Sequence, residues 1–235
     1  MIIRRIFAAL FAIFFFVSAY VLIADIGFGN NKMDDLVGKY YIENTIKDTT
    51  ALNVVSTVVV NYRGLDTLGE VTVLFVASVS VGVLMARFKG SKLWNVSTTP
   101  IHITAGRILF PLIWIFGAYI FVHGHLTPGG GFPGGAVIAS GVLLLTLAYK
   151  DYLPSSKLIT FSESISGSLY VLVGLIGLAI GGYFLYDFVY RTYGIGTIGT
   201  LISGGFIPIV YTIIGVKVGV ELSGILHHLS RDDTE

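Results

Sequence analysis

Long apolar stretches separated by short polar ones dominate the pattern along this chain. Each stretch approaches the roughly 20 apolar residues that a helix needs to cross a bilayer. The runs are continuous and lack the alternation of barrel strands. The pattern therefore predicts an all-α, polytopic membrane protein with about six transmembrane helices. The predicted helices cover residues 4–25, 67–87, 104–123, 133–150, 164–186 and 204–228.

Basic residues near the ends of these helices predict their orientation. They precede the first helix and lie in the connections 87–107 and 150–163, whereas 124–132 carries none. This favours both termini in the cytoplasm, although the outer loop 26–66 is an exception with several lysines. The uncharged run 6–24 is longer than the roughly 7–15 residues of a signal-peptide core, so we expect it to remain as the first helix.

Composition supports a protein that is covered by lipid. Hydrophobic residues make up 54% of the chain and charged residues 12%, about half the share in soluble domains. The net charge of +1 gives no basic patch for nucleic acid, and the absence of cysteine excludes disulfides and thiolate metal sites on this chain. We therefore expect a multi-pass protein of the cell membrane, with the bilayer and not nucleic acid as its surroundings.

A polar, turn-rich stretch at 90–103 predicts a boundary inside the chain. It separates a two-helix part, residues 1–92, from a four-helix part, residues 93–235.

A short polar stretch before the second predicted helix carries Asp66 and Glu70. On a helix these carboxylates lie four residues apart on one face, and Arg63 could approach both. One interpretation is a helix cap, with Asp66 as the N-cap and Thr67 with Glu70 as a capping box. The other is an ion-handling carboxylate, because acids inside membranes are costly and usually functional. Asp66 and Glu70 are thus candidates for an ion path.

A glycine-rich stretch separates the third and fourth predicted helices. Two prolines and six glycines within 124–135 predict that no regular helix continues there. Irregular backbone at membrane depth is tolerated only inside protein or beside water. We predict a structural motif that consists of Gly129, Gly130, Gly131, Pro133, Gly134 and Gly135.

Two histidines, His123 and His125, adjoin this motif. They could relay protons, bind a metal, or pack at the interface. A two-residue spacing would point them apart on a helix, and no third ligand is obvious. We therefore predict no metal site and keep both histidines as candidates for an ion path. No residue of the chain is predicted to be catalytic.

The last predicted helix begins at a second glycine motif, Gly204 and Gly205, and carries two charges in apolar surroundings. Lys217 lies roughly 20 Å along a helix that starts at Gly204, near the middle of a membrane. Lys217 and Glu221 are four residues apart on one face, and His228 extends the same stripe. Charges here need protein or water around them. The pair is either a structural ion pair or part of a proton path.

The last two motifs resemble the B subunit of Mrp-type multisubunit Na+/H+ antiporters, the MnhB family. The resemblance covers about 104–230. It rests on His123-Gly-His-Leu-Thr-Pro-Gly-Gly-Gly-Phe-Pro-Gly-Gly135, on Ser203-Gly-Gly-Phe-Ile-Pro208 and on Gly215-Val-Lys217-Val-Gly219. Pro133 departs from the family pattern, which has Gln there, and this puts the local turn in doubt.

The first half resembles the C-terminal end of the large Mrp A subunit. The matching residues are Asn53-Val-Val and Tyr62-Arg-Gly-Leu-Asp66-Thr67-Leu-Gly-Glu70-Val-Thr-Val. Both pieces in one chain resemble the Mrp-derived modules of archaeal membrane-bound hydrogenases and sulfur-reducing complexes.

These resemblances imply a transporter subunit and not an enzyme, with any catalytic centres on other chains. They imply no cofactor on this chain, Na+ and H+ as the transported ions, and other Mrp-like membrane subunits, with hydrogenase-like modules, as partners. The alternatives are a purely structural scaffold subunit and a subunit of a plain Mrp antiporter.

Overall fold

The computed structural model describes residues 2–26, 37–86, 98–149, 152, 154–189, 197–201 and 203–230. In this part of the chain every regular element is helical, which confirms the all-α prediction. The chain falls into two compact units, Met1–Ile42 and Glu43–Glu235.

The first unit contains α1 (Ile2–Ile26) and the beginning of α2 (Val37–Thr49). Helix α1 coincides with the predicted first span, 4–25. Its described apolar stretch, Arg5–Val21, is shorter than the other apolar helices. That α1 crosses the membrane therefore stays a prediction.

The second unit begins with the end of α2 and two short elements, α3 (Val54–Thr57) and the π-helix η2 (Val58–Tyr62). Five helices follow that are long and apolar enough to span a membrane by length and composition. They are α4 (Gly64–Met85), α5 (Pro100–Val122), α6 (Gly131–Ala148), α7 (Ser156–Gly181) and α9 (Ile207–Ser230). They correspond to the last five predicted spans, with α7 beginning eight residues before the predicted 164.

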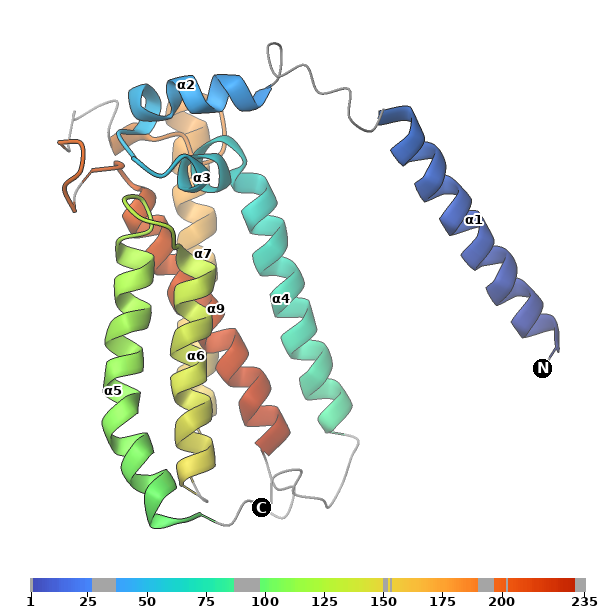
Figure 1. Cartoon of the computed structure of the whole chain (residues 1–235), viewed down its shortest axis with the longest axis vertical. Helices are drawn as coiled ribbons and strands as arrows, with labels where there is room; N and C mark the ends of the chain where they lie inside the picture. Colours follow the sequence, from blue (N-terminus) through green and yellow to red (C-terminus); the bar gives the residue numbers. More distant parts are fainter. Residues whose placement is uncertain are drawn as a thin grey trace. The chain divides into compact units, whose positions relative to one another are not determined.

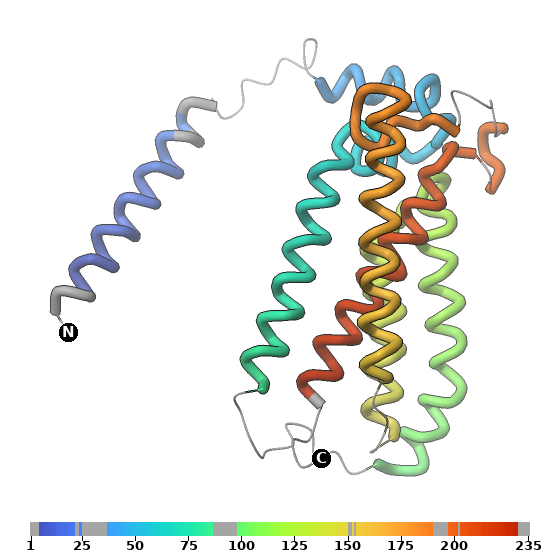
Figure 2. Tube along the Cα trace, turned by 180° about the vertical axis from the view of Figure 1, so that it is seen from behind, coloured from blue at the N-terminus to red at the C-terminus, as the bar shows by residue number. Residues whose placement is uncertain are grey.

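Helix α9 is the centre of this unit and runs obliquely across it (Figure 1). It packs against α4, α5, α6 and α7, and α4, α7 and α9 can be followed side by side from behind (Figure 2). Buried apolar side chains line its inner faces, among them Val210, Ile214 and Val218. Lys217 and Glu221 lie in this same central helix, so they are enclosed by protein.

Glycines allow α6 to approach its neighbours closely. A Cβ at Gly135 would lie 2.6 Å from the carbonyl oxygen of Gly215 on α9, and one at Gly134 would lie 2.8 Å from the carbonyl oxygen of Gly117 on α5. Small residues at such positions let membrane helices pack by backbone contact.

The expected break between the third and fourth helices is confirmed at 123–130, and the fourth helix begins two residues before the predicted 133. Helix α6 begins at Gly131, and Pro133 stands in its first turn, where a missing N–H removes no helical hydrogen bond. The irregular backbone is confined to 123–130. There Gly130 has a φ of 152°, which favours glycine.

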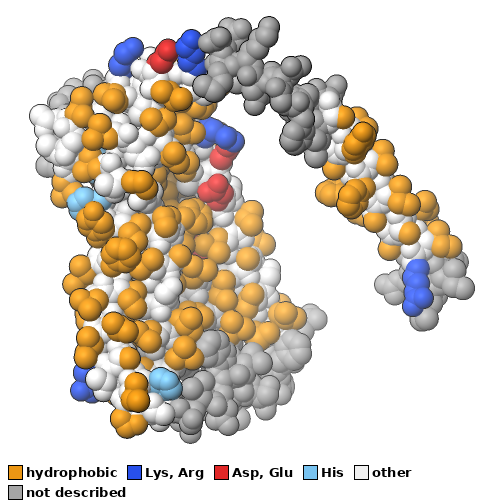
Figure 3. Space-filling view, viewed as in Figure 1, with side chains coloured by type: hydrophobic (Ala, Val, Ile, Leu, Met, Phe, Trp, Pro, Cys, Tyr) orange, Lys and Arg blue, Asp and Glu red, His pale blue; other side chains and the backbone are white. Residues whose placement is uncertain are grey.

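The outer surface of the bundle is apolar. On the face shown in Figure 3, hydrophobic side chains cover the length of the helices. Exposed residues such as Val73, Ile108, Ile115 and Leu172 suit contact with lipid or with other membrane subunits.

The orientation of the two chain termini relative to the membrane stays a prediction.

The predicted boundary at 90–103 falls partly on 90–97, which lie outside the described residues. Helix α4 precedes this stretch and packs on α9, which follows it. The division into 1–92 and 93–235 stays a prediction.

Candidate functional site

One end of the second unit is a buried polar layer. The segment 50–62, the loop 123–130 and the turn at 203–206 meet there. Asn53 connects the first two, because its Nδ2 donates to the carbonyl oxygens of Gly124 (2.9 Å) and Thr127 (3.0 Å). Ser56 also donates to Gly124. The backbone N–H of Gly204 donates to Thr50 Oγ1 over 3.1 Å, which attaches the third segment.

The two histidines have different environments. His125 is fully buried, and its Nε2 lies 3.3 Å from the carbonyl oxygen of Thr200. Its Nδ1 has no hydrogen-bond partner among the described residues. Burial lowers the pKa of His125 below its usual value of 6.5, and the backbone hydrogen bond to Thr200 offsets part of that shift. The ring of His123 instead lies 4.3 Å from that of Tyr119.

No three His, Cys, Asp or Glu side chains in the described part of the chain come together as a metal site. The expectation that the chain binds no metal stays a prediction.

The second glycine motif requires glycine at two consecutive positions. Gly204 and Gly205 have φ angles of 84° and 57°, in the left-handed region that suits glycine. A Cβ at Gly204 would lie 3.1 Å from the ring of His125, and one at Gly205 would overlap the carboxylate of Asp187. Asp187 is fully buried and was missed by the sequence analysis. The one feature of the sequence that could have indicated a buried Asp187 is that it is a lone acid among apolar residues, directly after the fifth predicted helix.

The capping interpretation of Asp66 and Glu70 is wrong. Helix α4 begins at Gly64 with Arg63 at the N-cap position and no side-chain cap. The hydroxyl of Thr67 donates to the carbonyl oxygen of Val59 over 2.8 Å, so it takes no part in a capping box. Asp66 stands in the first turn and forms an exposed ion pair with Arg63. The segment 54–62 turns back onto α4 and displaces the expected cap.

Glu70 lies further inside α4, roughly 9 Å along the helix from Gly64, and it is exposed. A small pocket of about 110 Å³ adjoins it, lined by Val58, Val59, Arg63, Asp66, Thr67 and Glu70. On the inner side of α4, the buried hydroxyl of Tyr170 on α7 donates to the carbonyl oxygen of Gly64 over 2.8 Å. Glu70 therefore faces away from the core, at the edge of a polar pocket.

Lys217 and Glu221 form the predicted pair. Their side chains are 10% and 0% exposed, and Lys217 Nζ lies 2.7 Å from Glu221 Oε1. Lys217 is in the middle of α9, as the spacing from Gly204 predicted. Its ammonium lies over the Phe75 ring of α4 and beside Gly167 of α7. The second oxygen of Glu221, Oε2, has no hydrogen-bond partner among the described residues.

His228 continues the stripe towards the end of α9. Its ring packs on α4, where a Cβ at Gly82 would lie 3.0 Å from Nε2. Lys217 and His228 thus both contact α4, which confirms that they share one face of α9.

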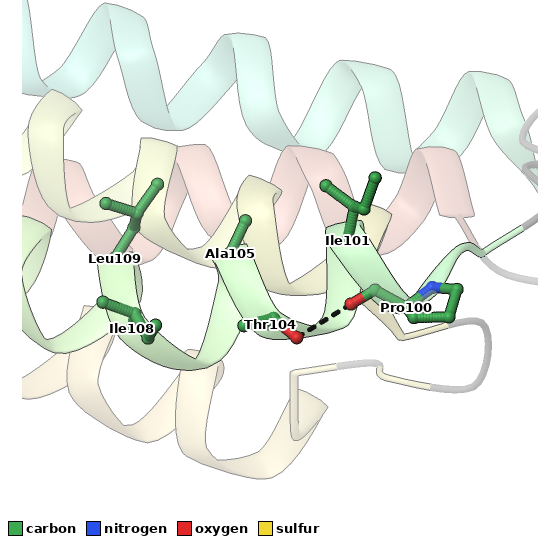
Figure 4. Close-up of a pocket in the computed structure, with 6 residues that line it drawn as sticks. All are labelled: Pro100, Ile101, Thr104, Ala105, Ile108 and Leu109. Atoms are coloured by element: carbon green, nitrogen blue, oxygen red, sulfur yellow. Dashed lines mark hydrogen bonds between the residues drawn. The ribbon is translucent and has the colours of Figure 1, made fainter.

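A shallow groove of about 520 Å³ lies along the start of α5. All six of its lining residues come from that helix (Figure 4). Its one side-chain hydroxyl, of Thr104, already donates to the carbonyl oxygen of Pro100 over 2.9 Å. The groove offers apolar contact and no further polar chemistry.

The family of the four-helix part is decided by comparison with family models. The model described as "Domain related to MnhB subunit of Na+/H+ antiporter" matches residues 101–224. The chain belongs to the MnhB family. This confirms the resemblance predicted from the glycine motifs. A second family model, MbhE, which describes the E subunit of MBH, matches residues 3–98 of this MnhB-family chain.

Known proteins resemble the MnhB-family chain over different lengths. The B subunit of a Na+/H+ antiporter from Alkalihalophilus pseudofirmus is 32% identical, over 55% of this chain and 91% of its own length. A chain in the structure of the membrane-bound sulfane sulfur reductase, an archaeal respiratory membrane complex, is 50% identical, with a TM-score of 0.76. That match covers 98% of this chain and 99% of the matched chain in the reductase complex.

A third match is to the Mrp complex from Dietzia sp. DQ12-45-1b. The matched chain is 27% identical, with a TM-score of 0.70, over 99% of this chain and 26% of the other. Family membership and five apolar helices make this MnhB-family chain a multi-pass membrane protein.

Proposed function

We propose that this chain is a membrane subunit of a multisubunit Na+/H+ antiporter module and helps to form its ion path. The observation that carries the proposal is the match to the respiratory complex, which spans nearly the whole of both chains at 50% identity. Its relatives are antiporter subunits. The chain then acts as a transporter subunit and not as an enzyme, with Na+ and H+ as the transported ions and no cofactor of its own.

The host complex is respiratory rather than a plain Mrp antiporter. The respiratory complex has a counterpart of nearly the same length, whereas this chain covers only 26% of the matched chain in the Mrp complex. Its partners are then other Mrp-like membrane subunits and a redox module of the hydrogenase or sulfur-reductase kind, which holds the catalytic centres.

Glu70 is the proposed ion-handling group at the surface of this subunit. It is an exposed carboxylate on a membrane-spanning helix, and an acid in that position is costly against lipid. Asp66 and Arg63 neutralise each other beside it. Glu70 is therefore the acid that must find water, an ion or a neighbouring subunit.

Replacement of Glu70 in the intact complex tests this role. Glu70→Gln keeps the shape and the hydrogen-bonding capacity but removes the titratable charge. We expect the complex to assemble and to lose most of its Na+/H+ exchange in sealed vesicles, whereas Glu70→Asp keeps part of it. Glu43→Gln, which removes an exposed acid of α2, is the matched control. Exchange by Glu70→Gln at the wild-type rate would contradict the proposal.

The tight glycine contacts of α6 with α5 and α9 favour a second function, a purely structural subunit with a closely packed bundle. Under this alternative Glu70 joins subunits and moves no ion. Glu70→Gln would then lower the yield of assembled complex, and total ion exchange would fall in proportion to that yield. Each complex that does assemble would exchange ions at the normal rate.

A further inference from the structure

The start of α4, the helix that carries Glu70, is not held by a capping side chain. The π-helix η2 ends at Tyr62, Arg63 follows with a φ of −125° and a ψ of 35°, and α4 begins at Gly64. Short π-helical turns are rare and are often found at functional sites. Contacts from elsewhere in the chain therefore fix the direction in which α4 leaves this junction.

One such contact comes from Tyr170 of α7, which lies beside α4 (Figure 2). The Tyr170 side chain is 1% exposed, and its hydroxyl donates to the carbonyl oxygen of Gly64 over 2.8 Å. A carbonyl oxygen has two lone pairs, so this bond leaves room for one inside the helix. The Tyr170 hydroxyl is therefore an additional anchor for the first residue of α4.

The turn that follows α7 holds the other side of the junction. The carbonyl oxygen of Leu185 accepts from Nδ2 of Asn61 in η2 over 3.3 Å. Leu185 is fully buried with a φ of 59°, a left-handed conformation that a leucine keeps only where its surroundings hold it. Gly64 gives Leu185 space, because a Cβ at Gly64 would lie 2.5 Å from Leu185 Cδ1. Residues 101–224, which match the MnhB model, thus hold a junction within residues 3–98, which match MbhE.

The shape of the pocket beside Glu70 depends on this junction. One wall consists of Val58 and Val59 of η2, Arg63 lies between the walls, and the first two turns of α4 form the other wall. The hydroxyl of Thr67 joins the walls, because it donates to the carbonyl oxygen of Val59 over 2.8 Å. A change in the angle between η2 and α4 would therefore move Glu70 relative to the opposite wall.

We propose that Tyr170 is a positioning residue for ion transport, whose hydroxyl keeps α4 at the angle at which the pocket beside Glu70 admits Na+. Tyr170 acts through α4 and touches no transported ion itself. Functional groups have to be held within about 0.5 Å of their working geometry by the residues that support them. The inference rests on the proposed function of Glu70 and deepens it, since it gives the MnhB-matching residues a part in that function.

The dependence of ion exchange on Na+ concentration tests the proposal. Tyr170→Phe removes the hydroxyl but keeps the ring, which packs on that of Phe184. We expect the intact complex in sealed vesicles to need about two- to tenfold more Na+ for half-maximal exchange, the range that the loss of one hydrogen bond allows. The maximal rate per assembled complex should stay close to that of the wild type.

The same measurement distinguishes a positioning residue from a merely structural one. A structural tyrosine would lower the yield and the thermal midpoint of the complex and leave the Na+ dependence of each assembled complex unchanged, and that result would overturn the proposal. Tyr211→Phe, which removes the hydroxyl of a buried tyrosine on α9, is the matched control and should leave the Na+ dependence unchanged. An equal shift in both variants would also overturn the proposal.

Amide hydrogen exchange on the same preparations shows whether the hydroxyl acts on α4. We expect Tyr170→Phe to speed exchange in residues 64–71, because local opening becomes easier when an anchor is lost. Unchanged protection there would refute the positioning role, even if the Na+ dependence shifts. Asn61→Leu releases the η2 side of the junction and should raise the Na+ requirement in the same way. This second variant decides the matter if Tyr170→Phe does not assemble.

Glu70→Gln, measured alongside, separates the inference from its premise. Normal exchange by Glu70→Gln would contradict the proposed role of Glu70, whatever Tyr170→Phe does. Loss of exchange in Glu70→Gln, together with a wild-type Na+ dependence in Tyr170→Phe, would sink the positioning role alone.

Discussion

The ammonium of Lys217 on α9 lies 5.5 Å from the centroid of the Phe75 ring on α4. A cation over an aromatic face gains roughly 0.5–2 kcal/mol, most where water is excluded, and Lys217 is largely buried. The contact joins helices that are more than 120 residues apart in sequence. It also holds the lysine on the side of α9 that faces α4, while its ion pair with Glu221 runs along α9.

Loss of the Phe75 ring should loosen the docking of α4 on α9. We expect Phe75→Leu to lower the thermal midpoint of the assembled complex, and Phe75→Trp to retain most of it because its face also attracts cations. In a double-mutant cycle with Lys217→Met, the two effects should not add. Val76→Leu, a change at an exposed neighbour, is the control. Additive losses would show that ring and ammonium do not interact.

A methyl group at Gly135 should separate α6 from α9. The added Cβ would lie 2.6 Å from the carbonyl oxygen of Gly215 and 2.8 Å from Val218 Cβ, neither of which is the end of a flexible side chain. Overpacking of this kind costs about 1–3 kcal/mol. We expect Gly135→Ala to reduce the yield and thermal midpoint of the complex. Gly38→Ala, where nothing lies within 4 Å of the new Cβ, should be nearly silent, and equal losses in both would contradict the packing argument.

His125 should make the complex sensitive to acid. Its pKa is lowered in the folded protein, chiefly by burial, so below about pH 6.5 the unfolded chain binds a proton that the folded chain does not. Stability therefore falls as the pH drops below about 6.5 and is unaffected above it. His125→Gln does not titrate and should flatten the dependence of the thermal midpoint between about pH 6.5 and 5. A wild-type midpoint that is constant over that range would contradict this prediction.

Asn53 has two separable roles. Its side-chain oxygen accepts from the N–H groups of Val55 and Ser56 at the start of α3, and its Nδ2 donates to Gly124 and Thr127 in the loop 123–130. Asn53→Asp keeps the cap but loses the two hydrogen bonds to Gly124 and Thr127, at about 0.5–1.5 kcal/mol each, and places a carboxylate oxygen against those two carbonyl oxygens. We expect faster amide hydrogen exchange in 123–130, with exchange at Ser56 preserved. Asn53→Ala should speed exchange in both places, and identical behaviour of the two variants would refute the separation.

The sequence by itself determined the features that depend on nearby residues. Five apolar runs of sufficient length became α4, α5, α6, α7 and α9, because a membrane helix satisfies its own backbone hydrogen bonds. The four-residue spacing of Lys217 and Glu221 placed them on one face, and the ion pair followed. The glycine motifs also identified the family, since close backbone approach admits few other residues.

Only the tertiary structure decided what depends on segments far apart in the chain. Residues 54–62 fold back to α4 and leave Arg63, not Asp66, at its N-cap position. Asp187 meets Gly205, and Lys217 meets Gly167 through the packing of α7 against α9. A pattern of spacing records which residues share a face of one helix. It does not record which face of another helix will be packed against them, because that is set by the shapes of both surfaces together.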